Sequence, residues 1–225
     1  MRSPGVFINC PFDDAYQPSH DAIVLTVVAC GLEPRSALES GTTSAPRMRR
    51  IYEALAGSRY SIHDLSRPYG DPAHGNLARF NMPFEFGMAF LLTEICTNMD
   101  QKHDWLGLVL EAHRHGEYLS DLAGHDLETH QGTPETLIAP VLGWLSTRPD
   151  VPSLPPTVDP AALIELLPEL DALLAAERLR WGGPPSLEPS GGGNSRPRRG
   201  ADGLGAARAR FRYRCGNRGF VERNP

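Results

Sequence analysis

Short apolar runs bounded by turn residues alternate with amphipathic segments along the first two thirds of the chain. Three of these runs predict buried strands, which begin at Val6, Tyr60 and Trp105. Weaker strand candidates lie at residues 34–38 and 126–129. Helical patterns cover residues 19–30, 47–56, 118–123 and 133–145, and another helix is expected to contain Glu85 and to end near Cys96. This alternation predicts an α/β fold with a mainly parallel, flavodoxin-like sheet of about five strands and helices on both faces.

The character of the chain changes after residue 148. Residues 149–158 are rich in proline and predict a linker between an α/β domain at 1–148 and a helical extension at 159–181. The extension carries a leucine stripe, its N-cap is Asp159, and Pro168 is expected to kink it or split it in two. Residues 182–225 are rich in Gly, Pro, Ser and Arg and are expected to be disordered. We interpret this tail as a passive solvated segment, with contact to nucleic acid or acidic partners as the alternative.

Charge and cysteine use narrow the class of protein. The net charge is −5, but the tail alone has nine arginines and three acidic residues, so the remainder carries about −11. This charge argues against nucleic-acid binding by the folded part. The four cysteines are scattered without the spacing of metal ligands, which predicts reduced thiols, a cytoplasmic location and no metal site. No signal peptide is expected at the start of the chain, and no apolar run approaches the ~20 residues of a membrane span.

Residues 79–89 are the most informative segment. Pro83 suits the first position of a helix and Asn81 could cap it, which would place Glu85 in the first turn, where the helix dipole favours an anion. Gly87 lies inside this helix, where glycine costs ~1 kcal/mol relative to alanine. We therefore expect a close approach at Gly87, either tight helix–sheet packing or a ligand.

Polar side chains follow the predicted strands at the edge where parallel α/β sheets bind ligands. Asp64, at the end of one strand, and Glu85, on the next helix, are the candidate catalytic residues. His63 alternates with Asp64 and so faces the opposite side, where we interpret it as a packing residue. The candidate substrate-binding residues are Asn9, Cys10, Pro11, Phe12, Asp13, Ser66, Arg67, Arg79, Asn81 and Gly87.

Two parts of the chain carry a resemblance to known families. The strand and turn at residues 6–12 and the segment at 82–89 resemble the nucleoside 2-deoxyribosyltransferase family, which has an apolar strand ending in a small-residue–Pro–Phe turn and a catalytic Glu at the start of a later helix. The order and setting also resemble TIR domains, some of which cleave NAD. A group of bacterial TIR-like proteins of unassigned function is more similar still, through Phe-Ile-Asn-Cys-Pro-Phe-Asp, Ser-Ile-His-Asp-Leu-Ser-Arg and Arg-Phe-Asn-Met-Pro-Phe-Glu.

The resemblance covers residues 5–148 and implies roles for particular residues. Glu85 matches the nucleophile, Asp64 matches a carboxylate that orients the substrate, and residues 9–12 would form part of the pocket wall. The transferases have an Asp-Pro-Gly or Asp-Ser-Gly turn before the Glu segment, whereas this chain has the bulkier residues 81–83 there. This departure argues against 2-deoxyribosyl transfer itself.

Three functions remain open from the sequence. The first is an N-glycosidase that cleaves NAD or a related nucleotide or nucleoside, with Glu85 as nucleophile or as stabiliser of an oxocarbenium-like state. The positive nicotinamide leaving group needs no general acid, which favours NAD over an ordinary nucleoside as the substrate. No cofactor is expected. The second is a nucleotide-binding or sensing module without turnover in bacterial defence or signalling, and the third is a self-assembling scaffold. The expected partners are a nucleotide or nucleoside and a second copy of the chain, with no membrane.

Overall fold

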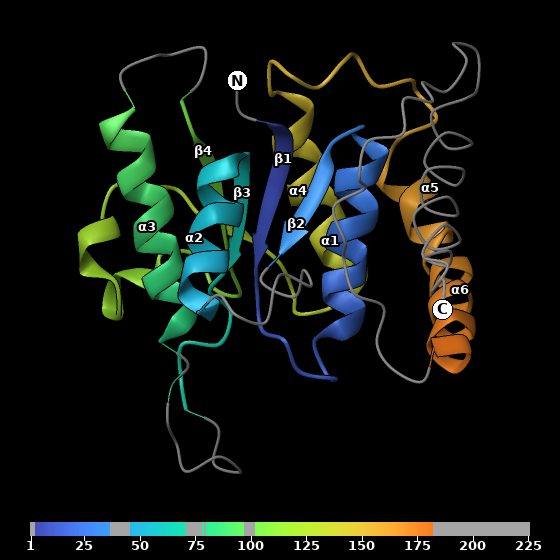
Figure 1. Cartoon of the computed structure of the whole chain (residues 1–225), viewed down its shortest axis with the longest axis horizontal. Coiled ribbons are helices and arrows are strands. Elements are labelled where there is room, and N and C mark those ends of the chain that lie inside the picture. The colour runs from blue at the N-terminus through green and yellow to red at the C-terminus, as the bar shows by residue number, and fades with distance from the viewer. Residues whose placement is uncertain (1–2, 37–45, 71–77, 79, 97–101, 182–225) are drawn as a thin grey trace, which may run out of the picture.

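Five parallel strands form one sheet at the centre of the molecule (Figure 1). The computed structural model describes residues 3–36, 46–70, 78, 80–96 and 102–181, and the side chains of residues 3–4 and 176–181 are outside this description. The strand order is β2-β1-β3-β4-β5, and every neighbouring pair is parallel. The strands are β1 (Ser3–Asn9), β2 (Glu33–Ser36), β3 (Ser58–Asp64), β4 (Asp104–Val109) and β5 (Glu128–Thr129). The predicted flavodoxin-like α/β fold is confirmed.

The central strands are buried because both of their faces are covered. All seven residues of β3 are buried, as expected for a parallel sheet between two helical layers. In β1, Val6 and Ile8 belong to the core on one face, whereas Phe7 packs on the other. The register pairs Asn9 with His63, so the polar ends of β1 and β3 lie side by side.

Helices cover the two faces of the sheet in separate layers (Figure 1). One layer is α1 (Gln17–Ala29) and α4 (Pro134–Ser146), against which α5 (Pro160–Glu165) and α6 (Leu167–Trp181) pack. The other layer is α2 (Arg47–Gly57) and α3 (Asn81–Ile95), which pack on Phe7 through Ile51, Leu55 and Ala89. Within the described residues, no helix combines the length and the apolar character needed to cross a membrane.

The C-terminal helices form part of the same core. The leucine stripe of the extension is buried against α1 and α4, and Leu163 is 0% exposed. The helix is interrupted at Leu166, between α5 and α6, and Pro168 stands in the first turn of α6, so the predicted split occurs. Asp159 caps α5 through a bond from the backbone N–H of Ala162 (3.0 Å). The predicted disordered tail at 182–225 lies outside the described residues.

Two helix predictions need correction. The helix expected at residues 118–123 is replaced by two short 3₁₀ helices, η3 (Arg114–Glu117) and η4 (Ser120–Leu122). This segment starts after His113 (φ 62°) and ends at Gly124 (φ 96°), and it has few apolar positions with which to bury a longer helix. Helix α3 begins at Asn81 rather than at Pro83, because the N–H of Phe84 already bonds to the carbonyl of Phe80 (3.0 Å).

Candidate functional site

The candidate site lies at the carboxyl ends of β1 and β3, where the strand order reverses. Ligands of open α/β sheets bind in the crevice outside this switch point. Here β1 ends at Asn9, β3 ends at Asp64, and α3 approaches from one face with Glu85. The topology therefore brings the two candidate catalytic carboxylates to one end of the sheet.

Asp64 is a buried carboxylate held by donors from three segments. It is 1% exposed, and its Oδ1 accepts a hydrogen bond from the backbone N–H of Ser66 (2.7 Å). Its Oδ2 accepts the hydroxyl of Tyr16 and lies 3.4 Å from Nε2 of His130. Burial alone would raise the pKa of Asp64, but the interaction with His130 and the bonds from Ser66 and Tyr16 outweigh it and lower the pKa below its ordinary value. Asp64 is therefore ionised at neutral pH.

The tautomer of His130 follows from its second neighbour. Nδ1 of His130 accepts the backbone N–H of Gly132 (3.0 Å), so the proton of the neutral ring is on Nε2, facing Asp64. Gly132 has φ 80°, a left-handed conformation that suits glycine. Sequence reasoning missed both His130 and Tyr16. The position of His130 directly after the weakly predicted strand β5, at the same edge as Asp64, is the signal that could have found it.

A chain of buried hydrogen bonds with one direction runs beside Asp64 along β3. The carbonyl oxygen of Ser58 can only accept, so His103, whose Nδ1 is 3.2 Å away, donates to it and accepts from Ser61 through Nε2 (2.8 Å). Ser61 in turn accepts from Nε2 of His63 (2.8 Å), and Nδ1 of His63 accepts from Nδ2 of Asn9 (2.9 Å). Burial, and secondarily His103, lower the pKa of His63 well below its ordinary value. His63 is thus a neutral, fully partnered residue, in agreement with its predicted packing role.

Asn9 links this chain to helix α3. Its Nδ2 also donates to the carbonyl oxygen of Met82 (2.9 Å), so both amide hydrogens are used and the orientation of the side chain is fixed. Its Oδ1 is buried and has no hydrogen-bond partner among the described residues. Asn9 therefore ties the end of β1 to the first turn of α3 and leaves one acceptor atom inside the site.

Glu85 has an environment opposite to that of Asp64. It is 3% exposed, and within the described part of the chain its Oε2 has no hydrogen-bond partner. Burial raises its pKa to about 7, although the charge of Arg47 pulls the pKa downward. The expectation that Glu85 lies in the first turn, where the helix dipole favours an anion, is wrong, because α3 begins at Asn81 and Glu85 is its fifth residue.

Cys10 is a buried thiol at the end of β1. It is 0% exposed, and burial, followed by the charges of Asp64, Asp21, Glu85 and Asp13, raises the pKa of its thiol well above the ordinary value. The thiol therefore stays protonated, so Cys10 is no nucleophile. Pro11 is buried beside it, and the ring of Phe12 stands edge-on to His20 with centroids 6.1 Å apart.

Asp13 and Arg67 form an ion pair near the start of α1. Nη1 of Arg67 is 2.5 Å from Oδ2 of Asp13, and its guanidinium carbon lies 5.5 Å from the centroid of the Tyr16 ring. The backbone N–H of Tyr16 bonds to Oδ1 of Asp13 (3.0 Å). The structure thus joins the predicted residues Asp13 and Arg67 to Asp64 through Tyr16.

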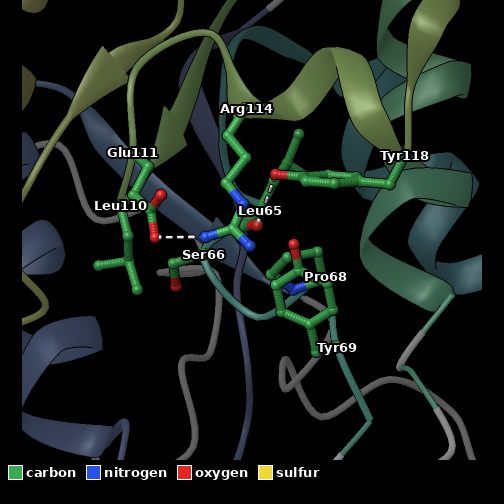
Figure 2. Close-up of a pocket in the computed structure, with 8 residues that line it drawn as sticks. All are labelled: Leu65, Ser66, Pro68, Tyr69, Leu110, Glu111, Arg114 and Tyr118. Carbon is green, nitrogen blue, oxygen red and sulfur yellow. Dashed lines mark hydrogen bonds and ion pairs between the residues drawn. The ribbon is translucent and has the colours of Figure 1, made fainter.

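Two neighbouring cavities open at this edge. The smaller, of about 80 Å³, is lined by Asp64, Leu65, Arg67, Pro68, Ala78, Phe80, Met82, Pro83, Tyr118 and Leu119. The larger, of about 310 Å³, is lined by Leu65, Ser66, Pro68, Tyr69, Leu110, Glu111, Arg114 and Tyr118 (Figure 2). Asp64 lines the smaller cavity, whereas Glu85 lines neither of the two.

Three sequence-predicted contacts differ from expectation or fall outside the description. Asn81 is exposed and caps nothing with its side chain, because it is the first residue of α3 and Phe80 is the N-cap. Gly87 is exposed, and a Cβ built on it meets no atom within 4 Å, so the close approach expected there is absent from the described residues. Arg79 lies outside the described residues.

The chemistry of the site has to be inferred from its own residues. No protein-family model matches the sequence, and comparison with curated proteins gives no match. In the part of the chain that the structure describes, no group of three or more His, Cys, Asp or Glu side chains is arranged to hold a metal ion. The distinguishing feature of the site is two buried carboxyl groups with opposite shifts: the pKa of Asp64 is lowered and the pKa of Glu85 is raised.

Proposed function

We propose that this protein cleaves the N-glycosidic bond of NAD or a related nucleotide, with Glu85 as the reacting carboxylate. The observation that carries the proposal is the state of Glu85: it is buried, its Oε2 is unpaired among the described residues, and its pKa is about 7. A buried polar group without a partner costs free energy, and a structural carboxylate would be paired. Strongly perturbed carboxyl groups of this kind gather at active sites.

The reaction requires Glu85 in its ionised form. As the bond between C1′ of the ribose and the nicotinamide nitrogen breaks, its electron pair moves to the nitrogen and cancels the positive charge of the ring. The carboxylate of Glu85 stabilises the oxocarbenium-like carbon or bonds to it, and water then attacks C1′, loses a proton and releases the carboxylate. The leaving group needs no proton, so the scheme requires no general acid.

Asp64 supplies a fixed negative charge and an acceptor for the sugar. Its Oδ1 accepts one bond from Ser66 and so retains a lone pair for a ribose hydroxyl at the wall of the smaller cavity. Two carboxyl groups whose surroundings push their pKa values apart can take separate roles in one reaction. The likeness of residues 5–148 to TIR-like and deoxyribosyltransferase-like proteins supports the same chemistry, and the reduced thiols of the buried residues Cys10 and Cys30 support a cytoplasmic location.

One observation favours a second candidate, a nucleotide-binding or sensing module without turnover. Asp64 and Glu85 line no common cavity among the two described, and Asp64 already has three donors. A module of this kind would bind the nucleotide at the same switch point and release it unchanged.

Release of nicotinamide from NAD separates the two candidates. The full chain is incubated with NAD at several protein concentrations, since a second copy of the chain is one of the proposed partners, and free nicotinamide is measured by chromatography. We expect turnover with kcat/KM rising with pH to a plateau above about 7, where Glu85 is ionised. Glu85→Gln should lower kcat by about 10³-fold or more, and Glu94→Gln, an exposed carboxylate on the same helix, should leave it unchanged. Binding of NAD without release of nicotinamide at any concentration would establish the binding module instead.

A further inference from the structure

The larger cavity is separate from the reacting carboxylate and has chemistry of its own. We propose that it binds the adenine base of the nucleotide, an assignment that rests on the proposed function. The scissile bond must lie beside Glu85, which does not line this cavity, so the cavity is left for the base that does not react. Its volume of about 310 Å³ is at the lower end of the range for small-molecule sites, about 300–1,000 Å³.

The cavity continues from the carboxyl ends of β3 and β4. Leu65 and Ser66 follow β3 directly, and Leu110 and Glu111 follow β4, so its floor belongs to the same sheet edge as Asp64. Its walls Leu65, Pro68 and Tyr118 also line the smaller cavity beside Asp64. A dinucleotide whose reacting ribose lies at Asp64 can therefore extend along the same edge and place its second base in the larger cavity.

The walls offer flat surfaces to a planar ring. Figure 2 shows the guanidinium of Arg114 extending over the ring of Tyr69, and its carbon is 5.2 Å from the ring centroid. The ring of Tyr118 lies across the cavity, and its hydroxyl donates to the carbonyl oxygen of Leu65 (3.4 Å), which limits rotation of the side chain. Tyrosine rings and guanidinium planes are the side chains on which nucleobases stack.

The charge of the larger cavity disfavours a phosphate. Among its described lining residues Arg114 is the cation, and its Nη1 lies 2.6 Å from the carboxylate of Glu111. Glu117, outside the lining, lies 3.4 Å from Nε of Arg114 and adds a second negative charge nearby. The guanidinium charge is therefore already balanced, and its face is available for stacking. The wall carboxylate of Glu111 is also an acceptor, which suits the exocyclic amino group of adenine.

Binding of free adenosine tests this assignment without any turnover. Adenosine is titrated into the full chain by calorimetry, and Tyr69→Ala should weaken its binding about tenfold through the loss of one stacking surface. Tyr52→Ala is the matched control, because Tyr52 is 55% exposed on α2 and Tyr69 is 58% exposed. Inosine, which lacks the amino group, should bind more weakly than adenosine, and Glu111→Gln should reduce that preference while Glu117→Gln, outside the cavity wall, should not.

Kinetics give an independent measure if the protein turns over. Tyr69→Ala should raise KM for NAD about tenfold, with kcat unchanged and with no effect on nicotinamide mononucleotide, which has no adenine. Failure of the proposed function would abolish turnover of both substrates but leave adenosine binding to decide the subsite. The assignment is overturned if adenosine does not bind, if Tyr69→Ala and wild type bind it equally, or if nicotinamide or inorganic phosphate displaces it from the cavity.

Discussion

Replacing Glu85 by glutamine should make the protein more stable, and increasingly so as the pH rises. The carboxyl group has an ordinary pKa of 4.5 and a pKa of about 7 in the folded protein. Between these values the unfolded chain has lost the proton and the folded chain has kept it. Folding stability therefore falls as the pH rises through this interval and is constant above it. Glutamine has nearly the same shape as glutamate and does not ionise, so the folding stability of the variant does not fall with pH for this reason.

The size of the effect follows from the two pKa values. Each pKa unit corresponds to about 1.4 kcal/mol, so the interval from 4.5 to about 7 corresponds to about 3 kcal/mol. This is the largest gain expected, and it requires the carboxyl group to stay as buried as its 3% exposure indicates. The variant should gain about 3 kcal/mol over wild type between acid conditions and pH 8, which is large against the total stability of a typical domain.

Urea unfolding of both proteins from pH 5 to pH 9 measures this gain. Other groups titrate equally in the two proteins, so the difference in unfolding free energy isolates Glu85. Glu94→Gln on the exposed side of α3 should give a difference that does not change with pH. A difference for Glu85→Gln that is constant with pH, or that favours wild type above pH 7, would refute the assignment of Glu85 as a buried, unpaired carboxyl group.

Three further substitutions test other parts of the structure. Asp64→Asn should destabilise the fold by about 3 kcal/mol at pH 7, because the amide cannot satisfy all three donors around it. Urea unfolding should show a smaller cost at acid pH, because protonation of Asp64 in the wild type removes the stability that its lowered pKa provides. Ser61→Ala should cost about 1–3 kcal/mol, because Nε2 of His63 and Nε2 of His103 each lose a buried hydrogen bond. Leu163→Ala should cost about 2–5 kcal/mol, since this residue of α5 is 0% exposed in the main core.

The fold was predictable from the sequence wherever an apolar run was long enough. The strands that begin near Val6, Tyr60 and Trp105 are largely buried, so their apolar residues contrast with the turns around them. The helix predicted at residues 118–123 was wrong because, over so few residues, one α-helical turn and one 3₁₀ turn give nearly the same spacing of apolar residues. The start of α3 was placed two residues late, because proline suits any position in the first turn, where no N–H partner is needed.

The sequence predicted which residues lie at the candidate site, but it did not predict their hydrogen-bond partners or their burial. Strand ends located Asn9, Asp64 and Glu85 at one edge, since parallel strands share their carboxyl end. The partners of Asp64 could not be found the same way: Tyr16 and His130 are 48 and 66 positions away along the chain, and only the packing of α1 and β5 brings them together. The pKa of Glu85 depends on its burial in the folded protein and on the charge of Arg47 on α2, which no local pattern encodes.

A comparison of His63 with Glu85 distinguishes a structural residue from a candidate functional residue at this site. Both are ionisable, and both are nearly or fully buried. His63 is neutral and has a partner for each ring nitrogen, so its burial is offset locally and needs no further explanation. Glu85 has an oxygen without a hydrogen-bond partner among the described residues and a raised pKa, so above pH 7 the fold is less stable with glutamate there than it would be with glutamine. Glu85 lowers the stability of the fold at the switch point of the sheet, and a ligand that binds there would explain why a carboxylate occupies this position. The nucleotide chemistry proposed for Glu85 rests on this difference between a partnered His63 and a Glu85 whose Oε2 has no partner among the described residues.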